Sequence, residues 1–489
     1  MKILYVVKDM SYIELHGIMQ LSALSKERGH KSCLGIINEH DILRLIEKDK
    51  PDIVAFSVLT LDASSFESLA RDIKNKHKNL TIVAGGPHST FNPEIIDNWE
   101  VDAIVCGEGD DAFVDFLKAA EGGYDYSDIK NLQTKEQKNP LRPLIDNLDR
   151  LPFPDRELVY FKGGHLLNLN VRTFMTSRGC AYRCTYCFNN KYNMLYLSKG
   201  KIFRRRSVDY VIEEILKVKE KYPFNFVRFG DDNFVYELDR WIEEFSVKYK
   251  KMVNLPFYCL IRPNLINNKL VRLLRSTGCY SIGMSIESGS ESIREKILKR
   301  GMTDEDLIRA FDIVHRNGIH AFANSMVGIP FATVSDEIKS VELAIKCKPA
   351  YPNFTIFTPF PGVELSDLAY KNNLVNDDLP QRTTDRSVLN CFTNKEKDIQ
   401  ENIVTLGPLM VRFPSLKPLI LNFLINLPPN SLFRYIWIIN KGYLGSKYIW
   451  PIKMDFLLKI KIFIKSFLFE MPGFNKSYRR FFFRCIKNR

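Results

Sequence analysis

The chain has 489 residues and a mass of 56.8 kDa, which is too long for one ordinary domain and suggests about three. Its composition, 45% hydrophobic and 26% charged residues, is that of a globular protein and excludes a fibrous or wholly disordered chain. No uninterrupted apolar stretch reaches the ~18 residues of a membrane span. The ten cysteines are scattered, and the N-terminus enters a strand rather than a signal peptide, so we expect a reducing, cytoplasmic compartment.

The net charge of +13 is concentrated at the C-terminal end. Between Cys391 and Arg489 there are 17 Lys and Arg residues but only five Asp and Glu residues, a balance of +12. The first 390 residues are therefore almost neutral, and any role of the basic charge belongs to the last hundred residues or so.

Residues 1–142 alternate short apolar runs with amphipathic helical patterns. A typical helical pattern places Phe66, Leu69, Ala70 and Ile73 on one face. Near-continuous apolar strands between such helices predict a parallel sheet covered on both faces, here a Rossmann-like, flavodoxin-like domain. The predicted strands are Ile3–Val7, Ser32–Ile37, Ile53–Leu59, Leu80–Ala84 and Ala103–Cys106.

Two of these strands end in small residues, Gly85-Gly86-Pro87-His88-Ser89 and Gly107-Glu108-Gly109-Asp110. Ligands of open parallel sheets bind outside the carboxyl ends of the strands, and glycine there lets a bulky ligand approach the backbone. The same glycines are equally compatible with ordinary turns, so the pattern alone leaves a ligand site open.

Residues 143–170 form a predicted linker rich in Pro, Asp and Arg, and strands and helices alternate again over residues 171–374. Five or six βα units predict a full or partial (β/α)6-type barrel, whose site lies at the carboxyl ends of its strands. Polar residues recur there in Gly230-Asp231-Asp232-Asn233, Glu287-Ser288-Gly289 and Gly328-Ile329-Pro330. The predicted strands are Arg172–Thr176, Phe226–Phe229, Phe257–Leu260, Ser281–Ile286, Ala321–Val327 and Phe354–Phe357.

Three cysteines follow the first barrel strand within eight residues, Cys180, Cys184 and Cys187. Three thiols so close can hold one metal centre, and an iron–sulfur cube with three protein ligands keeps one iron open for a small molecule. A zinc site would need a fourth ligand, and His165 lies 15 residues before Cys180. A disulfide would leave one thiol over, and three structural cysteines at this spacing would be a coincidence.

The C-x3-C-x2-C run after the first barrel strand resembles the radical S-adenosylmethionine (SAM) superfamily over roughly residues 171–374. The resemblance implies that the three cysteines hold a [4Fe–4S] cluster, whose open iron binds SAM. It also implies roles for further residues. Tyr186 would pack near the adenine, and Gly328 and Arg262 would line the same pocket. Asp231 or Asp232 would accept from the amino group of SAM, in the place of the family's Gly-Gly-Glu motif. Ser285 and Glu287 would contact the ribose. Taken singly, each carboxylate could be a solvated loop residue.

A Rossmann-like domain directly before such a barrel resembles the cobalamin-binding subfamily. The resemblance implies that loops at the strand ends cradle the corrin and its nucleotide tail. These loops comprise Ser57, Thr60, Gly85, Gly86, Pro87, His88, Gly107, Glu108 and Gly109. The chain lacks the Asp-x-His-x-x-Gly motif that supplies a lower axial histidine in many cobalamin domains, which implies that no histidine holds the cobalt here. A domain that has lost cobalamin is the alternative.

The parts imply methyl transfer from methylcobalamin to an unactivated carbon of a small or lipid-like molecule, with SAM also cleaved to a 5′-deoxyadenosyl radical by an electron from a ferredoxin or flavodoxin. A cobalamin-assisted cyclase or oxidase, as in chlorophyll biosynthesis, is the alternative. A non-catalytic cobalamin or iron–sulfur sensor is a third reading. Methylthiotransfer would need three cysteines in the N-terminal domain, which has only Cys33 and Cys106.

Residues 375–489 lie outside these motifs and form a basic, aromatic-rich region that we expect to be mostly helical. Its apolar stretches are Leu419–Leu427, Leu432–Asn440, Phe456–Phe469 and Phe481–Phe483. Lysines interleave with aliphatic residues over Lys453–Lys465, which is typical of a helix at an anionic membrane surface, here the inner face. A helical cap on the barrel fits the pattern equally well. Nucleic acid is not expected, because the basic residues lie among long aliphatics rather than in a polar stripe.

Overall fold

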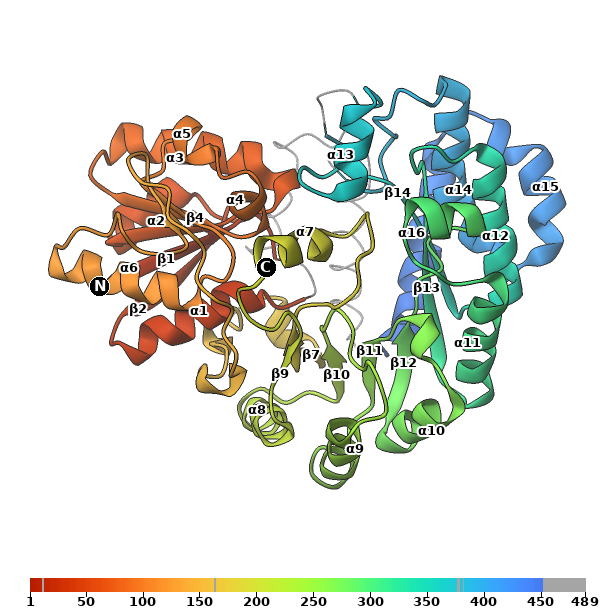
Figure 1. Cartoon of the computed structure of the whole chain (residues 1–489), viewed down its shortest axis with the longest axis horizontal. Coiled ribbons are helices and arrows are strands. Elements are labelled where there is room, and N and C mark those ends of the chain that lie inside the picture. The colour runs from red at the N-terminus through yellow and green to blue at the C-terminus, as the bar shows by residue number, and fades with distance from the viewer. Residues whose placement is uncertain (11–12, 162–163, 376–378, 381, 452–489) are drawn as a thin grey trace, which may run out of the picture. The chain divides into compact units, whose positions relative to one another are not determined.

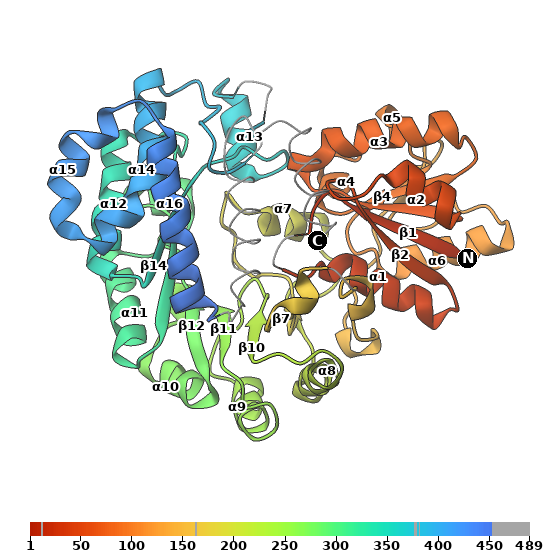
Figure 2. The same cartoon turned by 180° about the vertical axis from the view of Figure 1, so that it is seen from behind.

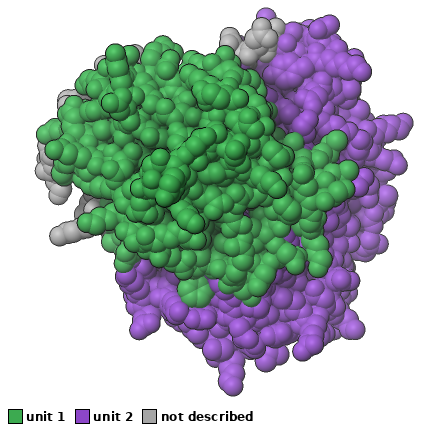
Figure 3. Space-filling model, turned by 60° about the vertical axis from the view of Figure 1, so that its left-hand side comes forward, with its two compact units in different colours: residues 1–168, 192–202, 473–489 green, residues 169–191, 203–472 purple. Residues whose placement is uncertain are grey.

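The computed structural model describes residues 1–489 except 11–12, 162–163, 376–378, 381 and 452–489. The described chain divides into two compact units, coloured separately in Figure 3. Unit 1 contains Met1–Asn168 and Tyr192–Ile202, and unit 2 contains Leu169–Lys191 and the described part of Phe203–Pro472. The segment Tyr192–Ile202 therefore packs with the N-terminal unit, although it follows the cysteine motif in sequence. The domain boundaries at residues 142 and 374 stay a prediction.

Unit 1 is built on one six-stranded sheet with helices on both faces (Figure 1). The strand order is β2-β1-β3-β4-β5-β6, parallel except for the antiparallel pair β5–β6. The order 2-1-3-4-5 is that of flavodoxin-like folds, which confirms the predicted class. The strands are β1 (Lys2–Val7), β2 (Lys31–Ile36), β3 (Ile53–Ser57), β4 (Thr81–Gly85), β5 (Ala103–Val105) and β6 (Leu132–Gln133). The helices are α1 (His16–Glu27), α2 (Ile42–Asp49), α3 (Ala63–Lys76), α4 (Pro87–Phe91), α5 (Ile95–Asn98) and α6 (Asp110–Gly122).

The apolar runs of unit 1 form strands because both faces of the sheet are buried. Ile3, Leu4, Tyr5 and Val6 are all fully buried in β1, the second strand of the sheet. The helical stripe predicted from Phe66 to Ile73 packs inward from α3. Short 3₁₀ turns at Leu148–Arg150, Arg156–Leu158 and Leu166–Asn168 fill the predicted linker, where Leu148 and Leu151 pack against Leu24.

Unit 2 is an open barrel of six parallel strands in the order β14-β13-β12-β11-β10-β7. Because β7 and β14 are the two edges of this sheet, the barrel is partial, as the sequence predicts. The strands are β7 (Val171–Phe174), β10 (Phe226–Phe229), β11 (Phe257–Leu260), β12 (Cys279–Gly283), β13 (His320–Val327) and β14 (Tyr351–Ile356). A two-stranded ribbon, β8 (Ser177–Arg178) with β9 (Arg204–Arg205), follows the first strand, before and after α7 (Phe188–Leu195).

Helices follow the barrel strands, and those from α8 to α12 cover the outside of the sheet (Figure 1). They are α8 (Val208–Lys221), α9 (Arg240–Met252), α10 (Asn268–Thr277), α11 (Asp304–Arg316) and α12 (Val334–Cys347). Helix α13 (Glu364–Lys371), after β14, instead contacts the cysteine loop, where the Leu365 N–H donates to the Thr185 carbonyl. Side-chain caps fix several starts; Thr303 and Thr333, for example, each form a capping box. The main core joins these helices to the strands through residues such as Phe229, Phe245 and Phe257.

The described part of the C-terminal region is helical, as predicted. It contains α14 (Asn394–Arg412), α15 (Lys417–Asn422) and α16 (Ser431–Leu444). Helix α14 packs on the barrel, because Ile403, Val404, Leu406 and Met410 belong to the main core. No described helix is long and apolar enough to cross a membrane. The predicted membrane segment Lys453–Lys465 lies outside the described residues.

Candidate active site

The three cysteines lie on the loop between β8 and α7. Cys184 is buried, Cys180 and Cys187 are half-buried, and none forms a disulfide. The backbone N–H of Cys187 donates to the carbonyl of Cys184 at 3.2 Å, which folds the last turn of the loop. Burial raises the pKa of the Cys180 thiol and raises that of Cys187 to about 12, so both stay protonated until a metal binds.

The thiol arrangement fits a cluster better than a single ion. Within the described residues no three His, Cys, Asp or Glu side chains are close enough together to ligate one metal ion. In an iron–sulfur cube each cysteine binds a different iron, so its ligands do not converge on one point. All three cysteines nevertheless interact electrostatically, which places them around one small volume.

Arg262 lies against this loop. It follows β11, and its Nη1 donates to Cys184 Sγ at 3.1 Å, while the guanidinium lies 4.1 Å from the centre of the Tyr182 ring. Asn233 fixes its backbone by accepting from the Arg262 N–H at 2.9 Å. The sequence predicts Arg262 in the SAM pocket; the structure places its charge directly beside one cluster ligand, where a hydrogen bond to sulfur favours negative charge on a cluster.

The two aspartates after β10 have different surroundings. Asp231 is fully buried, and its Oδ1 accepts from Thr176 N–H at 2.9 Å, Thr176 Oγ1 at 3.0 Å and Ser177 Oγ at 2.5 Å. Burial outweighs these bonds and raises the pKa of Asp231 to about 6. Its Oδ2 is buried and has no hydrogen-bond partner among the described residues. Asp231 therefore holds the chain that leads from β7 into the cysteine loop.

Asp232 faces the cysteine loop instead. It keeps solvent contact, yet enough protein surrounds it that desolvation raises the pKa of its carboxyl, against a hydrogen bond from Asn189. Its charge also acts on Cys180 and Cys187. Of the two residues predicted to accept from the amino group of SAM, Asp232 is therefore the one whose position suits a ligand at the cluster.

A buried cluster of polar side chains lies at the end of β12. Tyr186 Oη donates to Glu287 Oε1 at 3.1 Å, and Arg300 Nη1 donates to Tyr186 Oη at 2.5 Å. Arg300 also pairs with Glu287 at 3.7 Å and donates to the Ser285 carbonyl at 2.9 Å. Glu287 has a φ of +67°, a strained conformation for a residue with a side chain and one that clusters at functional sites.

This cluster links the predicted ribose and adenine residues to each other. Burial raises the pKa of Tyr186 well above its usual range, so its phenol stays neutral. Burial alone lowers the pKa of Arg300, but Tyr186 and Glu287 raise it, so the guanidinium stays charged. The Nη2 group of Arg262 donates to the Arg300 carbonyl, so one chain of contacts runs from Cys184 to Glu287.

Sequence reasoning missed Arg300, because this residue lies in a polar Lys299-Arg300-Gly301 turn after a π-helical turn and shows no period or motif.

Sequence reasoning also missed Glu337 and Gln400. The Gly328 N–H donates to Glu337 Oε1 at 2.6 Å, and Gln400 Nε2 donates to the same oxygen at 3.0 Å. Burial raises the pKa of Glu337 to about 8. The C-terminal helix α14 thus helps to hold the loop predicted to lie beside the adenine.

The predicted cobalamin loops come together at one edge of unit 1, because β3, β4 and β5 are neighbours. Gly86 has a φ of +99°, and a Cβ there would lie 2.9 Å from the Val58 carbonyl, so backbone packing alone requires glycine. At Gly85 a Cβ would lie 3.9 Å from Val105, in ordinary van der Waals contact, so protein packing does not require glycine there. Ser57 and Thr60 flank this edge, and the side chain of Leu59 between them is 54% exposed.

The other loop residues are partly occupied by protein contacts. His88 stacks on Trp99 with ring centres 5.5 Å apart and contacts Asn92 Nδ2 at 3.1 Å, and burial lowers its pKa. This histidine is therefore held in place by contacts with Trp99 and Asn92. Pro87 is exposed at the start of α4, and Gly109 precedes α6.

Tyr196 lies directly over Gly107. Its Oη accepts from the Glu108 N–H at 2.8 Å, and a Cβ at Gly107 would lie 1.9 Å from the same oxygen. Glu108 Oε2 accepts from the Ile145 N–H at 2.9 Å. Gly107 is thus required by Tyr196 and by its φ of +75°, rather than by a ligand.

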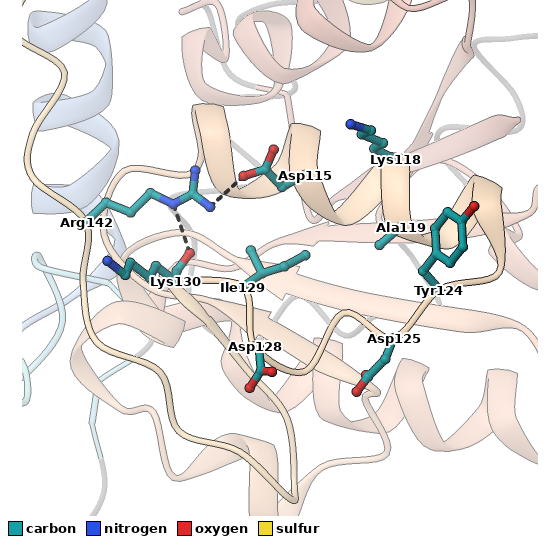
Figure 4. A pocket seen from close by; sticks show the side chains of 9 residues that line it. All are labelled: Asp115, Lys118, Ala119, Tyr124, Asp125, Asp128, Ile129, Lys130 and Arg142. Atoms are coloured by element: carbon teal, nitrogen blue, oxygen red, sulfur yellow. Dashed lines mark hydrogen bonds and ion pairs between the residues drawn. The ribbon is translucent and has the colours of Figure 1, made fainter.

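A separate surface pocket of about 390 Å³ in unit 1 contains none of the predicted site residues (Figure 4). Arg142 crosses one side of it, with an ion pair to Asp115 at 2.6 Å and a hydrogen bond to the Lys130 carbonyl at 3.2 Å. Its mixed acidic and basic lining is that of a solvated surface, so we do not place the site there.

Comparison with known proteins identifies both units. Residues 174–344 match the radical SAM superfamily, and residues 8–117 match the B12 binding domain. An uncharacterized methyltransferase of Pyrococcus horikoshii is 32% identical over 342 residues, which cover 68% of this chain and 73% of that protein. An anaerobic magnesium-protoporphyrin IX monomethyl ester cyclase of Rubrivivax gelatinosus is 24% identical, over 67% of this chain and 60% of that protein.

Two solved structures share the fold. The methyltransferase TsrM of Kitasatospora setae, with cobalamin and a [4Fe–4S] cluster bound, has a TM-score of 0.68 at 14% identity and covers 95% of this chain and 98% of that chain. The cobalamin-dependent enzyme OxsB, with aqua-cobalamin and SAM bound, has a TM-score of 0.67 at 15% identity, covering 99% and 75%. This chain belongs to the cobalamin-binding radical SAM enzymes. The predicted cofactors, a [4Fe–4S] cluster, SAM and cobalamin, are confirmed with the family.

Proposed function

We propose that this enzyme methylates an unactivated carbon of a small or lipid-like molecule. When bound, the cluster and SAM supply an electron and a 5′-deoxyadenosyl radical, and methylcobalamin supplies the methyl group. The proposal draws on the methyltransferase relative above and on a second relative, a cytidylyl-2-hydroxyethylphosphonate methyltransferase of Streptomyces wedmorensis, 23% identical over 60% of this chain and 61% of that protein.

The observation that carries the proposal is the set of side chains around the cysteine loop. Cys180, Cys184 and Cys187 would hold the cluster by three corners. Asp232, beside two of these cysteines, would accept from the ammonium of SAM. Arg262 keeps a positive charge at Cys184, where it would stabilise the negative charge of a reduced cluster.

The residues of the second group would orient SAM. Glu287, fixed by Tyr186 and Arg300, would accept from the ribose hydroxyls, with Ser285 beside it. Gly328, whose N–H is engaged by Glu337, would present its loop to the adenine. Positioning of this kind is the main contribution of the protein to the reaction, because the cofactors perform the bond cleavage.

At the edge of unit 1, the loops containing Ser57, Thr60, Gly85 and the segment up to Gly109 would take cobalamin. A glycine at position 85 that protein packing does not require, and the exposed Leu59, suit a flat, largely apolar macrocycle. A flavodoxin or ferredoxin would supply the electron. Peripheral contact with a membrane is part of the same proposal, from the basic and apolar alternation of residues 453–465.

Methylthiotransfer is disfavoured, although a putative methylthiotransferase of Methanocaldococcus jannaschii is 24% identical over 72% of this chain. The two N-terminal cysteines are Cys33 on β2 and Cys106 just after β5, and three strands separate β2 from β5 in the sheet. Burial raises the pKa of these thiols to about 11 and about 12. They cannot share a second cluster.

The test follows a labelled methyl group. Anaerobically reconstituted protein is given SAM with a deuterated methyl group, cobalamin, dithionite and a metabolite and lipid extract, and products are read by mass spectrometry. We expect 5′-deoxyadenosine together with label in an organic product. Formation of 5′-deoxyadenosine without label in any product would contradict methylation and favour the cyclase or oxidase alternative. No 5′-deoxyadenosine at all would favour a non-catalytic sensor.

A further inference from the structure

Helix α16 is apolar on two opposite faces. Phe433, Trp437, Ile438 and Leu444 are buried against the rest of unit 2. A second set points to solvent at helical spacing, which we call the outer apolar face. Its members and their exposed fractions are Leu432 (63%), Tyr435 (38%), Ile436 (36%), Ile439 (58%) and Tyr443 (47%). From Leu432 to Tyr443 this face runs about 16 Å along the helix. Helix α16 is the blue helix labelled in Figure 2.

The exposed apolar surface is concentrated in this part of the chain. Ten of the nineteen exposed large hydrophobic side chains of the described residues lie between Phe413 and Tyr443. The Arg412 guanidinium lies 5.5 Å from the ring centres of both Phe413 and Tyr443, so the exposed segment that starts at Phe413 begins beside the end of the outer apolar face. Scattered exposed hydrophobics are ordinary, but a contiguous group marks an interaction surface.

The charged residues of segment 402–454 all have one sign, because the sequence contains no Asp or Glu between Glu401 and Asp455. Two cations contact the outer apolar face itself. Lys447 donates to Tyr443 Oη at 2.9 Å, and the Arg412 guanidinium lies 5.5 Å from the Tyr443 ring centre. Tyrosines with an apolar body and a polar tip, flanked by cations, are typical of side chains that lie at the level of lipid headgroups.

Charge complementarity selects the occupant. A second copy of this face would bring the same cations together. The segment 453–489 of this chain is itself basic, with ten Lys and Arg residues against two acidic residues, so it would also repel this surface. An anionic lipid surface accepts both the apolar side chains and the cations.

We propose that the outer apolar face of α16, with Lys447 and Arg412 beside it, docks this enzyme on the surface of an anionic membrane. The side chains enter the boundary between headgroups and acyl chains while the cations stay among the headgroups. This docking does not depend on whether the enzyme methylates or cyclises its substrate, and it adds a described surface to the one predicted from residues 453–465.

The test is co-sedimentation of the reconstituted full chain with phosphatidylcholine vesicles, with and without phosphatidylglycerol. We expect binding that requires phosphatidylglycerol and falls with salt. The double variant Ile436→Ser, Ile439→Ser should bind about tenfold more weakly or worse, because it removes two inserted side chains. Lys447→Glu should bind about fivefold more weakly at least, given about 1 kcal/mol per basic residue near the surface.

The matched control is Val247→Ser on α9, whose side chain is 68% exposed and far from this segment in sequence; it should bind like the native chain. All variants should form 5′-deoxyadenosine at the native rate, which separates this proposal from the proposed function. Binding that ignores phosphatidylglycerol, or that survives in the double variant, would overturn the proposal. Loss of binding in the triple variant Lys459→Glu, Lys461→Glu, Lys465→Glu, with native binding in the α16 variants, would also overturn the proposal. So would light scattering that shows a native dimer and a monomeric double variant.

Discussion

The strand ends of unit 1 and those of unit 2 are built from different groups. In unit 1, glycines and backbone atoms form the edge, and several of the glycines are required by neighbouring protein atoms, as at Gly86 and Gly107. In unit 2, buried charged side chains such as Glu287 and Arg300 occupy the corresponding place. A large, nearly neutral macrocycle is held by shape, whereas a cluster and a sulfonium need fixed charges. The difference predicts that single substitutions in unit 2 act mainly on activity and on the pairing of charged side chains. Single substitutions in unit 1 should act mainly on how tightly cobalamin is retained.

The largest effect is expected from the cysteines of unit 2. Cys184→Ser should lose most of the iron after anaerobic reconstitution and form no 5′-deoxyadenosine, because a cube with two protein ligands is not retained. The measurements are iron content and chromatography of the nucleoside product. Cys391→Ser, at an exposed cysteine outside the motif, is the control and should keep native iron. A native iron content in Cys184→Ser would contradict the assignment of the cluster to this loop.

Arg300→Gln should destabilise the fold by about 3–5 kcal/mol, because it leaves the Glu287 carboxylate buried without its cation. Urea unfolding followed by circular dichroism measures the loss. Arg309→Gln breaks an exposed ion pair with Asp306 and should change stability by less than about 1 kcal/mol. Equal losses of unfolding free energy in the two variants would mean that the buried ion pair contributes no more to stability than the exposed one.

The pH dependence of stability should report Glu337. Burial raises its pKa to about 8, so between the unfolded value of 4.5 and about 8 the folded state binds more protons than the unfolded state. Unfolding free energy should therefore fall as pH rises through this window, on the order of a few kcal/mol. Glu337→Gln keeps the oxygen that accepts from Gly328 and should flatten the curve. An unchanged slope in this variant would show that another group is responsible.

The smallest effects on folding are expected in unit 1, where two glycines differ. Gly85→Ala should leave stability within about 0.5 kcal/mol but weaken retention of cobalamin, since the added methyl meets Val105 without a clash and stands at the proposed ligand edge. Gly107→Ala should cost about 1–2 kcal/mol, because its φ is +75° and Tyr196 occupies the space. Desalting followed by visible spectroscopy of the corrin bands measures retention. Full retention of cobalamin in Gly85→Ala would mean that the corrin does not bind at this edge.

The sequence predicts what local pattern controls. Apolar runs located every principal strand of both sheets, because each of these strands buries side chains in a core. The run Ser281–Ile286 extended beyond β12, which ends at Gly283, although Met284 and Ile286 still donate backbone hydrogen bonds to Phe322 and Asn324 of β13. The spacing of Cys180, Cys184 and Cys187 predicted the family.

Contacts between distant segments could not be predicted in this way. Gln400 meets Glu337 across 63 residues, and Tyr196 meets Glu108 across 88. Each is one polar residue in a stretch without a motif, and only the folded chain shows what it contacts. The difference between Asp231 and Asp232 is of the same kind, because adjacent residues of one type differ only in what surrounds them.

The central claim is that Cys180, Cys184 and Cys187 hold a [4Fe–4S] cluster with one iron open to SAM. The most direct measurement is the EPR spectrum of anaerobically reduced protein, recorded before and after SAM is added. We predict a cubane signal whose g-values shift on addition of SAM and do not shift on addition of 5′-methylthioadenosine, which lacks the amino and carboxylate groups that would bind the open iron. A spectrum with no cubane, or a cubane signal that SAM leaves unchanged, would contradict the account.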